Sequence, residues 1–132
     1  MLIESLGKGD GVFRILKSFG WAFSGIRQVS MTQPNMKIHL TAALLVIIVC
    51  VSLLHMPALE LAIVILAIFM VLAAEMFNTA LEAAVDLTTT RRHPLAKVAK
   101  DAAAGAVLLT ALNAVVVAYL LIWPHLRNQI LR

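Results

Sequence analysis

Four polar residues at the end of a long apolar segment have types and a spacing suited to chemistry at a membrane. Glu75, Asn78, Glu82 and Asp86 are separated by three, four and four residues. On an α-helix, at 100° per residue, they fall within an arc of about 80° over roughly three turns. A solvated helix end would explain Asp86, but Glu75 follows fourteen consecutive apolar residues. Because charged groups within a bilayer are costly and usually functional, the spacing predicts a carboxylate stripe that faces a protein interior.

Three kinds of chemistry use carboxylates without cysteine ligands. A di-iron carboxylate site needs Glu-x-x-His pairs, whereas Glu75 is followed three positions later by Asn78. Proton or cation passage needs only one or two buried carboxylates, so a small transport or accessory subunit remains an alternative. Phosphoryl transfer supported by Mg²⁺ also fits, because Mg²⁺ takes few protein carboxylates and completes its shell with water and phosphate oxygens.

The segment that follows the stripe favours phosphoryl transfer over ion passage. It brings cations and acids close together in Arg91, Arg92, His93, Lys100 and Asp101. Interleaved charges of this kind suit a nucleoside triphosphate and its metal ion. Proton or cation passage does not require these charged groups. The sequence contains no Gly-x-x-x-x-Gly-Lys-[Ser/Thr] motif. An ATP site here would therefore be built without any common nucleotide-binding fold.

The composition requires helices that lie in a membrane. Of the 132 residues, 61% are hydrophobic and 14% are charged, against about 25% charged in an ordinary soluble domain. Three apolar segments, 38–54, 58–87 and 102–123, approach or exceed the ~20 residues that a spanning helix needs. The lone Cys50 excludes an internal disulfide. We predict an all-α membrane protein with three transmembrane helices in one domain over residues 1–132.

The first thirty residues are interrupted by charges and do not resemble a cleavable signal peptide. Residues 12–30 instead predict an amphipathic helix that lies in the membrane interface. Its apolar positions recur at helical spacing, at Val12, Ile15, Leu16, Phe19, Phe23 and Ile26. The opposite face carries Arg14, Lys17, Trp21, Ser24 and Gln28. Trp21 fits either an interfacial anchor or a surface on which a nucleotide base stacks.

The basic residues predict the orientation in the membrane. A net charge of +4 could indicate nucleic-acid binding. In so apolar a chain, however, basic residues serve as membrane anchors and orientation signals. We therefore expect no nucleic-acid partner. Nine of the basic residues precede the first span or lie in 88–101, namely Lys8, Arg14, Lys17, Arg27, Lys37, Arg91, Arg92, Lys97 and Lys100. The turn at 55–60 has none and the tail has two. The N-terminus and the 88–101 loop should therefore be cytoplasmic.

Taken together, these motifs resemble the prokaryotic diacylglycerol kinase family, most of all its undecaprenol kinase branch. The pattern E-x-x-N-T-A-x-E-x-x-V-D at 75–86 and the stretch HPLAKVAKDAAAGAV at 93–107 carry the resemblance. GVFRILK at 11–17 and GWAFSGIR at 20–27 are similar to the family's N-terminal surface helix, and NMKIH at 35–39 is similar to the stretch before its first span. The resemblance covers nearly the whole chain.

The resemblance implies a homotrimer in the cytoplasmic (inner) membrane, with composite active sites that transfer the γ-phosphate of ATP to a lipid hydroxyl. It implies that Glu75 is the general base and that Glu82, together with His39, contacts Mg²⁺ and the nucleotide. For His39, a phosphate or carboxylate contact is the alternative to a metal contact. The remaining nucleotide-binding positions are Arg14, Trp21, Asp86, Arg91, Arg92, His93, Lys100 and Asp101. The positions that support the substrate or the site are Asn78, Lys17 and Gly25.

Two departures from diacylglycerol kinases indicate the acceptor. Diacylglycerol kinases carry a glutamate where this chain has His39, and a histidine there is typical of the undecaprenol kinase branch. Ala104 stands where the diacylglycerol branch tends to have serine. The resemblance therefore implies that ATP and Mg²⁺ are used to convert undecaprenol into undecaprenyl phosphate. The alternative is a diacylglycerol kinase that makes phosphatidic acid.

Overall fold

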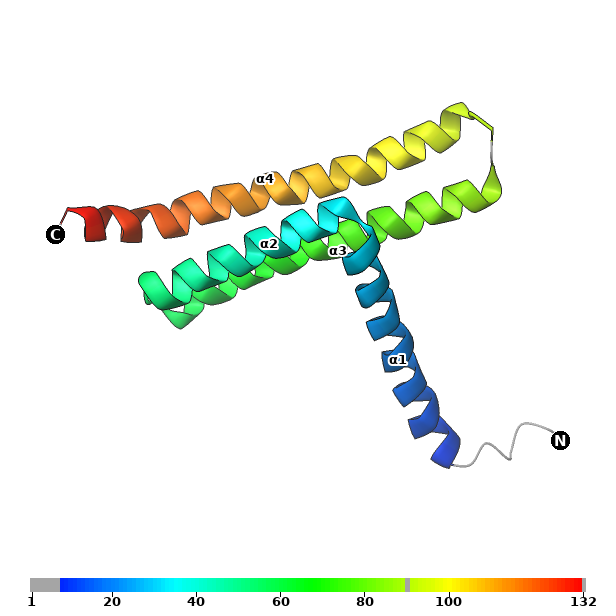
Figure 1. Cartoon of the computed structure of the whole chain (residues 1–132), viewed down its shortest axis with the longest axis horizontal. Helices are drawn as coiled ribbons and strands as arrows, with labels where there is room; N and C mark the ends of the chain where they lie inside the picture. The colour runs from blue at the N-terminus through cyan, green and yellow to red at the C-terminus, as the bar shows by residue number, and fades with distance from the viewer. Residues whose placement is uncertain (1–7, 90, 132) are drawn as a thin grey trace. The chain divides into compact units, whose positions relative to one another are not determined.

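The computed structural model describes residues 8–89 and 91–131, and this part of the chain is helical without a strand. The helices are α1 (Lys8–Thr32), α2 (Pro34–Ile48), α3 (Ala58–Thr88) and α4 (Pro94–Ile130), with a short π-helix, η1 (Val49–Leu53), after α2 (Figure 1). Three helical stretches, Pro34–Leu53, Ala58–Thr88 and Pro94–Ile130, are long and apolar enough to cross a membrane. The predicted all-α membrane fold, with three spanning helices and an N-terminal helix, is confirmed.

The first span and α3 form a hairpin. Gln33 is extended, and Pro34 opens α2 at its first turn, where a proline ring fits because the first amide groups have no helical partner. The π-helix continues the span to Leu53. His55 then takes a positive φ of 48°, an uncommon left-handed conformation for a residue other than glycine, and Pro57 caps α3. The chain thus reverses within a few residues.

Helix α4 is longer than the apolar segment 102–123 from which we predicted the third span. It begins at Pro94, where the Leu95 amide donates a hydrogen bond of 3.2 Å to His93 Nδ1, and it runs past Pro124 to Ile130. A capping side chain and a proline in the first turn are strong signals for a helix start. Lys97 and Lys100 therefore lie on the first turns of α4 and not in a loop.

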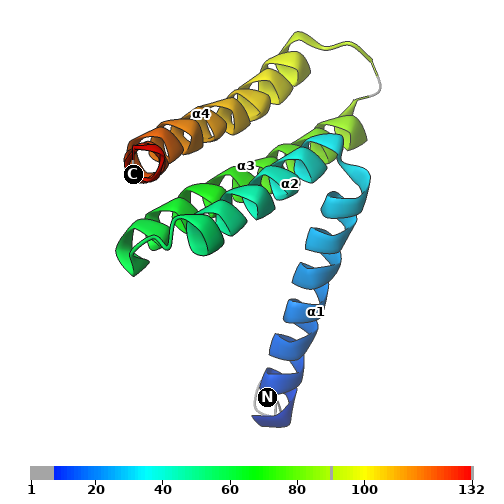
Figure 2. The same cartoon turned by 60° about the vertical axis from the view of Figure 1, so that its left-hand side comes forward.

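Helices α2, α3 and α4 run side by side, and α3 is the one that packs against both others (Figures 1 and 2). The buried residues of α3 are Val64, Ala67, Val71, Glu75 and Asn78. They recur every three or four positions, so they form one face of the helix. Most other large apolar side chains point outward, for example Phe69 and Leu109, as expected for helices surrounded by lipid or by other membrane-embedded subunits.

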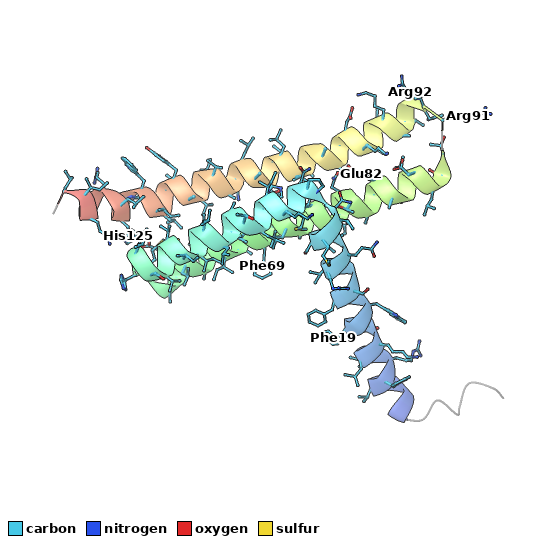
Figure 3. The ribbon with its side chains drawn as sticks, in the orientation of Figure 1. Phe19, Phe69, Glu82, Arg91, Arg92 and His125 are labelled. Atoms are coloured by element: carbon cyan, nitrogen blue, oxygen red, sulfur yellow. The ribbon has the colours of Figure 1, made fainter. Side chains whose placement is uncertain are left out.

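Helix α1 forms a compact unit of its own, separate from the unit that begins at Gln33. Its apolar side chains Val12, Ile15, Leu16 and Phe23 are exposed, as is Phe19, which is labelled in Figure 3. A helix with an unpaired apolar face and a basic opposite face is typical of an element that lies in a membrane interface.

Candidate active site

Glu75 and Asn78 are the two buried polar residues in the described part of the chain. Glu75 is 2% exposed and Asn78 is 6% exposed. Both continue the face of α3 that holds Val64, Ala67 and Val71. Glu75 Oε2 and Asn78 Oδ1 have no hydrogen-bond partner within residues 8–89 and 91–131. Because an unpaired buried oxygen is costly, these two atoms point to a ligand that the protein accommodates here.

Asn78 connects the buried part of the stripe to its exposed part. Its Nδ2 donates a hydrogen bond of 3.1 Å to Oε1 of Glu82, one helical turn further along α3. Glu82 is half-buried and Asp86 is exposed, so the same face of α3 passes gradually from the interior of the bundle to its surface. The hydrogen bond fixes the Glu82 carboxylate and leaves its second oxygen available.

An ion pair joins the ends of α3 and α4. Lys100 Nζ lies 2.5 Å from Asp86 Oδ1, and the two side chains are 37% and 65% exposed. A second pair, Lys97 with Asp101, lies on one face of α4. Exposed pairs contribute little to stability, so their main effect here is to place four charged groups around one opening.

That opening is a cavity of about 700 Å³ at the α3–α4 connection, within the usual range for small-molecule sites. Arg91 and Arg92 lie in the connection beyond Glu82 (Figure 3). The cavity is lined by Val85, Asp86, Thr89, Arg91, Arg92, His93, Pro94, Ala96, Lys97, Lys100 and Asp101. It therefore gathers six of the site residues that the sequence indicated, and its cations are the groups that bind phosphate oxygens.

Lys97 and Thr89 line this cavity and were missed as site residues by the sequence reasoning. Lys97 had a usable signal, because it lies one turn before Lys100 on the same helix and four residues before Asp101. Thr89 had none. It caps the end of α3 and its hydroxyl exchanges hydrogen bonds with the backbone of Arg91.

The other predicted site residues lie elsewhere. His39 is on α2 and lines a separate apolar pocket. Arg14, Lys17, Trp21 and Gly25 are on α1, which is a unit of its own, so their part in the site remains a prediction.

The carboxylates and the amide of the stripe fit a magnesium ion. No three His, Cys, Asp or Glu side chains in the described ranges lie together as a complete metal cage. Mg²⁺ does not need one, since it is commonly held by one or two carboxylates together with substrate phosphates and water. The Glu82 carboxylate and Asn78 Oδ1, which has no partner among the described residues, supply hard oxygen donors of the kind that it prefers.

Known proteins resemble this chain along most of its length. A model of the prokaryotic diacylglycerol kinase family matches residues 20–122. The chain is 45% identical to a diacylglycerol kinase of Synechocystis sp. over 113 residues, 85% of this chain and 64% of that protein. It is 42% identical to the undecaprenol kinase of Bacillus subtilis, over 86% of this chain and 91% of that protein. It is 30% identical to the diacylglycerol kinase of Escherichia coli K12, over 87% and 93%.

The family match includes the buried Glu75 and Asn78, Glu82, the Asp86–Lys100 pair and the whole cavity at the α3–α4 connection. This chain belongs to the prokaryotic diacylglycerol kinase family.

Proposed function

We propose that the protein is an ATP- and Mg²⁺-dependent lipid kinase that transfers the γ-phosphate of ATP to the hydroxyl of undecaprenol. The observation that carries the proposal is the buried Glu75, whose Oε2 has no partner among the described residues. It lies on the same helix face as Glu82 and Asp86, which lead to a cavity lined by cations. A carboxylate buried among apolar side chains and a cavity lined by phosphate-binding cations are the two parts that such a reaction needs.

In this reaction Glu75 accepts the proton of the lipid hydroxyl. The lipid oxygen forms a bond to the γ-phosphorus while the bond from that phosphorus to the β-γ bridging oxygen breaks, and ADP leaves with the bonding electrons. Glu75 is close to apolar side chains and away from water, so water does not compete with the lipid for the phosphoryl group. A positioned base contributes typically ~10²–10⁴-fold to rate.

Glu82 and Asn78 would hold the magnesium ion, which supplies charge neutralisation for the β- and γ-phosphates when bound. Asn78 also has a positioning role, because its amide Nδ2 donates a hydrogen bond to one oxygen of Glu82. Lys100 is held beside Asp86 at the cavity wall. It neutralises charge on the transferred phosphoryl group, while Arg91, Arg92 and Lys97 bind the remaining phosphates.

Two features favour undecaprenol as the acceptor. His39 and Ala104 depart from the diacylglycerol branch in the same direction, and the 42% identical relative whose length is almost fully covered is named an undecaprenol kinase. Diacylglycerol is the second candidate, because the Synechocystis relative, 45% identical, is named a diacylglycerol kinase. That relative is longer than the matched region, since the chain covers 64% of it.

The proposal includes the assembly and the orientation. It takes the assembly to be a homotrimer and keeps four residues of α1 as expected nucleotide-contacting or supporting residues, namely Arg14, Lys17, Trp21 and Gly25. The basic residues of the α3–α4 connection would face the cytoplasm of the cell, where ATP is available. The inner membrane is then the location.

The test is a phosphorylation assay with purified protein in lipid-detergent micelles, γ-labelled ATP, Mg²⁺ and matched amounts of undecaprenol or diacylglycerol. We expect labelled undecaprenyl phosphate as the main product, and no label on lipid when Mg²⁺ is chelated. Equal or faster labelling of diacylglycerol would transfer the assignment to the second candidate. Absence of ATP turnover with every lipid would favour the transport or accessory alternative.

A further inference from the structure

The connection between α3 and α4 is held by a side chain at each of its two ends. At the α4 end, the Leu95 amide donates a hydrogen bond of 3.2 Å to His93 Nδ1. At the α3 end, the Thr89 hydroxyl bonds twice to the backbone of Arg91. It accepts from the Arg91 amide at 3.2 Å and donates to the Arg91 carbonyl oxygen at 3.1 Å. One hydroxyl can make both bonds, because it carries one proton to donate and two lone pairs to accept.

Thr89 also ends α3, so the two hydrogen bonds define how the chain leaves the helix. The Thr89 amide donates 3.1 Å to the Val85 carbonyl oxygen and closes the last turn, while its own backbone is extended, with φ −151° and ψ 131°. A β-branched residue is well suited to extended backbone. A threonine hydroxyl that bonds the backbone two residues further on replaces the hydrogen bond of a backbone turn. The path from α3 to Arg91 is therefore set by one side chain.

Arg91 differs from the lysines that line the same cavity in how its charge is held. Lys97 is paired with Asp101. Lys100 is paired with Asp86. The Arg91 guanidinium forms no ion pair within residues 8–89 and 91–131, and the side chain is exposed at the cavity wall. Its position relative to the cavity therefore depends on its backbone, and the two hydrogen bonds from Thr89 fix that backbone.

From this arrangement we propose that Thr89 is a positioning residue for the nucleotide, which holds Arg91 beside the cavity in the conformation that binds phosphate oxygens. The inference rests on the proposed function, because it takes Arg91 as a ligand of the ATP phosphates. A group that is already held in its binding conformation loses less conformational freedom when the ligand arrives. If the hold is removed, the apparent dissociation constant rises in inverse proportion to the fraction of molecules that retain this conformation.

The hydrogen bonds also argue against a direct contact between Thr89 and the nucleotide. The single hydroxyl proton is donated to the Arg91 carbonyl oxygen, so none remains for a phosphate oxygen, which can only accept. Thr89 is also fourteen residues from Glu75, about 20 Å along α3 at 1.5 Å per residue. Its effect should therefore reach nucleotide binding through Arg91 and should leave the proton transfer at Glu75 unchanged.

The first test is Thr89→Val, which removes the hydroxyl and keeps the shape of the side chain and the backbone hydrogen bond to Val85. We expect both KM for ATP and the dissociation constant of a fluorescent ATP analogue with Mg²⁺ to rise on the order of five- to tenfold, the worth of one or two ordinary hydrogen bonds. The kcat at saturating ATP and KM for the lipid should not change. Thr89→Ser, which retains a hydroxyl, should restore the affinity.

The matched control is Thr88→Val. The Thr88 hydroxyl donates 2.7 Å to the Val85 carbonyl oxygen of its own helix, and Thr88 does not line the cavity. We expect unchanged ATP affinity in this variant and a similar small shift of the melting temperature in both valine variants. Unchanged affinity in Thr89→Val, an equal loss in Thr88→Val, or no recovery in Thr89→Ser would each overturn the proposal.

The second test asks whether Thr89 acts through Arg91. Arg91→Met should itself weaken binding of the ATP analogue, and adding Thr89→Val should weaken it no further, because residues that act through one contact are not additive. A further loss in the double variant would show that Thr89 acts by another route and would refute the proposal. If this binding pattern is found but no lipid is phosphorylated, the proposed function fails and the role of Thr89 stands. If undecaprenol is phosphorylated while Thr89→Val binds ATP normally, the present inference alone fails.

Discussion

Replacing Glu75 with glutamine separates the chemical step from nucleotide binding. Glutamine keeps the size of the side chain and removes the base. Glu75 lies seven residues from Glu82, about 10 Å along α3 at 1.5 Å per residue, and one turn further from the cavity than the Asn78–Glu82 hydrogen bond. We therefore expect Glu75→Gln to lose ~10²–10⁴-fold in kcat, the usual worth of a positioned base, with nearly unchanged affinity for ATP and Mg²⁺.

The matched variant is Glu82→Gln. Its amide oxygen can still accept from Asn78 Nδ2, as Oε1 does in the structure, so the local geometry is kept while the charge is removed. We expect weaker ATP binding in the presence of Mg²⁺ and a higher Mg²⁺ requirement. Glu75→Asp, which retains a carboxylate one methylene shorter, should recover part of the lost rate.

The assay measures ATP binding with a fluorescent nucleotide analogue and turnover with γ-labelled ATP in the same micelles. Normal nucleotide binding by Glu75→Gln shows that the variant is folded, a necessary control because its side chain is 2% exposed. Residual activity within tenfold of the wild-type protein would remove Glu75 from the role of base. Equal loss of nucleotide affinity in both variants would show that the stripe acts as one electrostatic unit and would refute the division of roles.

Three further predictions concern the two ends of the bundle. Lys100→Met should weaken ATP binding at least tenfold, measured by titration, yet change the melting temperature little, because exposed ion pairs contribute about 0–1 kcal/mol. A cysteine-reactive probe that cannot cross the membrane should label cysteines introduced at 55–60 from outside the cell, and those introduced at 91–101 only after lysis. Glu60→Gln should lower the free energy of unfolding by about 1 kcal/mol and leave KM for ATP unchanged, because Glu60 Oε2 lies 2.7 Å from His125 Nε2. If the two residues interact, adding His125→Gln to this variant lowers the free energy of unfolding no further; additive losses of stability would refute the pair.

The carboxylate stripe shows what the sequence could predict. A period of 3.6 residues places Glu75, Asn78 and Glu82 on one face whatever the neighbouring helices do, and the apolar run before Glu75 requires burial of that face. The Asn78–Glu82 hydrogen bond follows from the same i, i+4 geometry. These features are local to one helix, and periodicity is the most reliable signal in a sequence.

Side-chain contacts between different helices could not be predicted from the periodicity of the sequence. The Asp86–Lys100 and Glu60–His125 pairs depend on the relative register of α3 and α4, which is set by the length of the connection and by side-chain packing. The early start of α4 is a different case. Apolarity marks the membrane-embedded length of a helix, whereas its start depends on capping, here by His93 and Pro94. For this reason the connection between α3 and α4 is shorter than the loop that we expected at 88–101. Lys97 therefore lies on α4, from which it lines the cavity.

The order of residues along one face of α3 explains how so small a chain could join a lipid to a nucleotide. Ala67 and Val71 line the apolar pocket, Glu75 is buried one turn further on, and Asp86, at the far end, lines the charged cavity. In the proposed reaction the acceptor comes from the bilayer and the donor from water, so the two must meet along the membrane normal. A single helix that crosses this boundary presents the required groups in the required order, because successive turns of one face are about 5 Å apart. In the proposed reaction such a helix needs no separate nucleotide-binding domain, and the geometry of the site then depends on the register that the α3–α4 packing maintains.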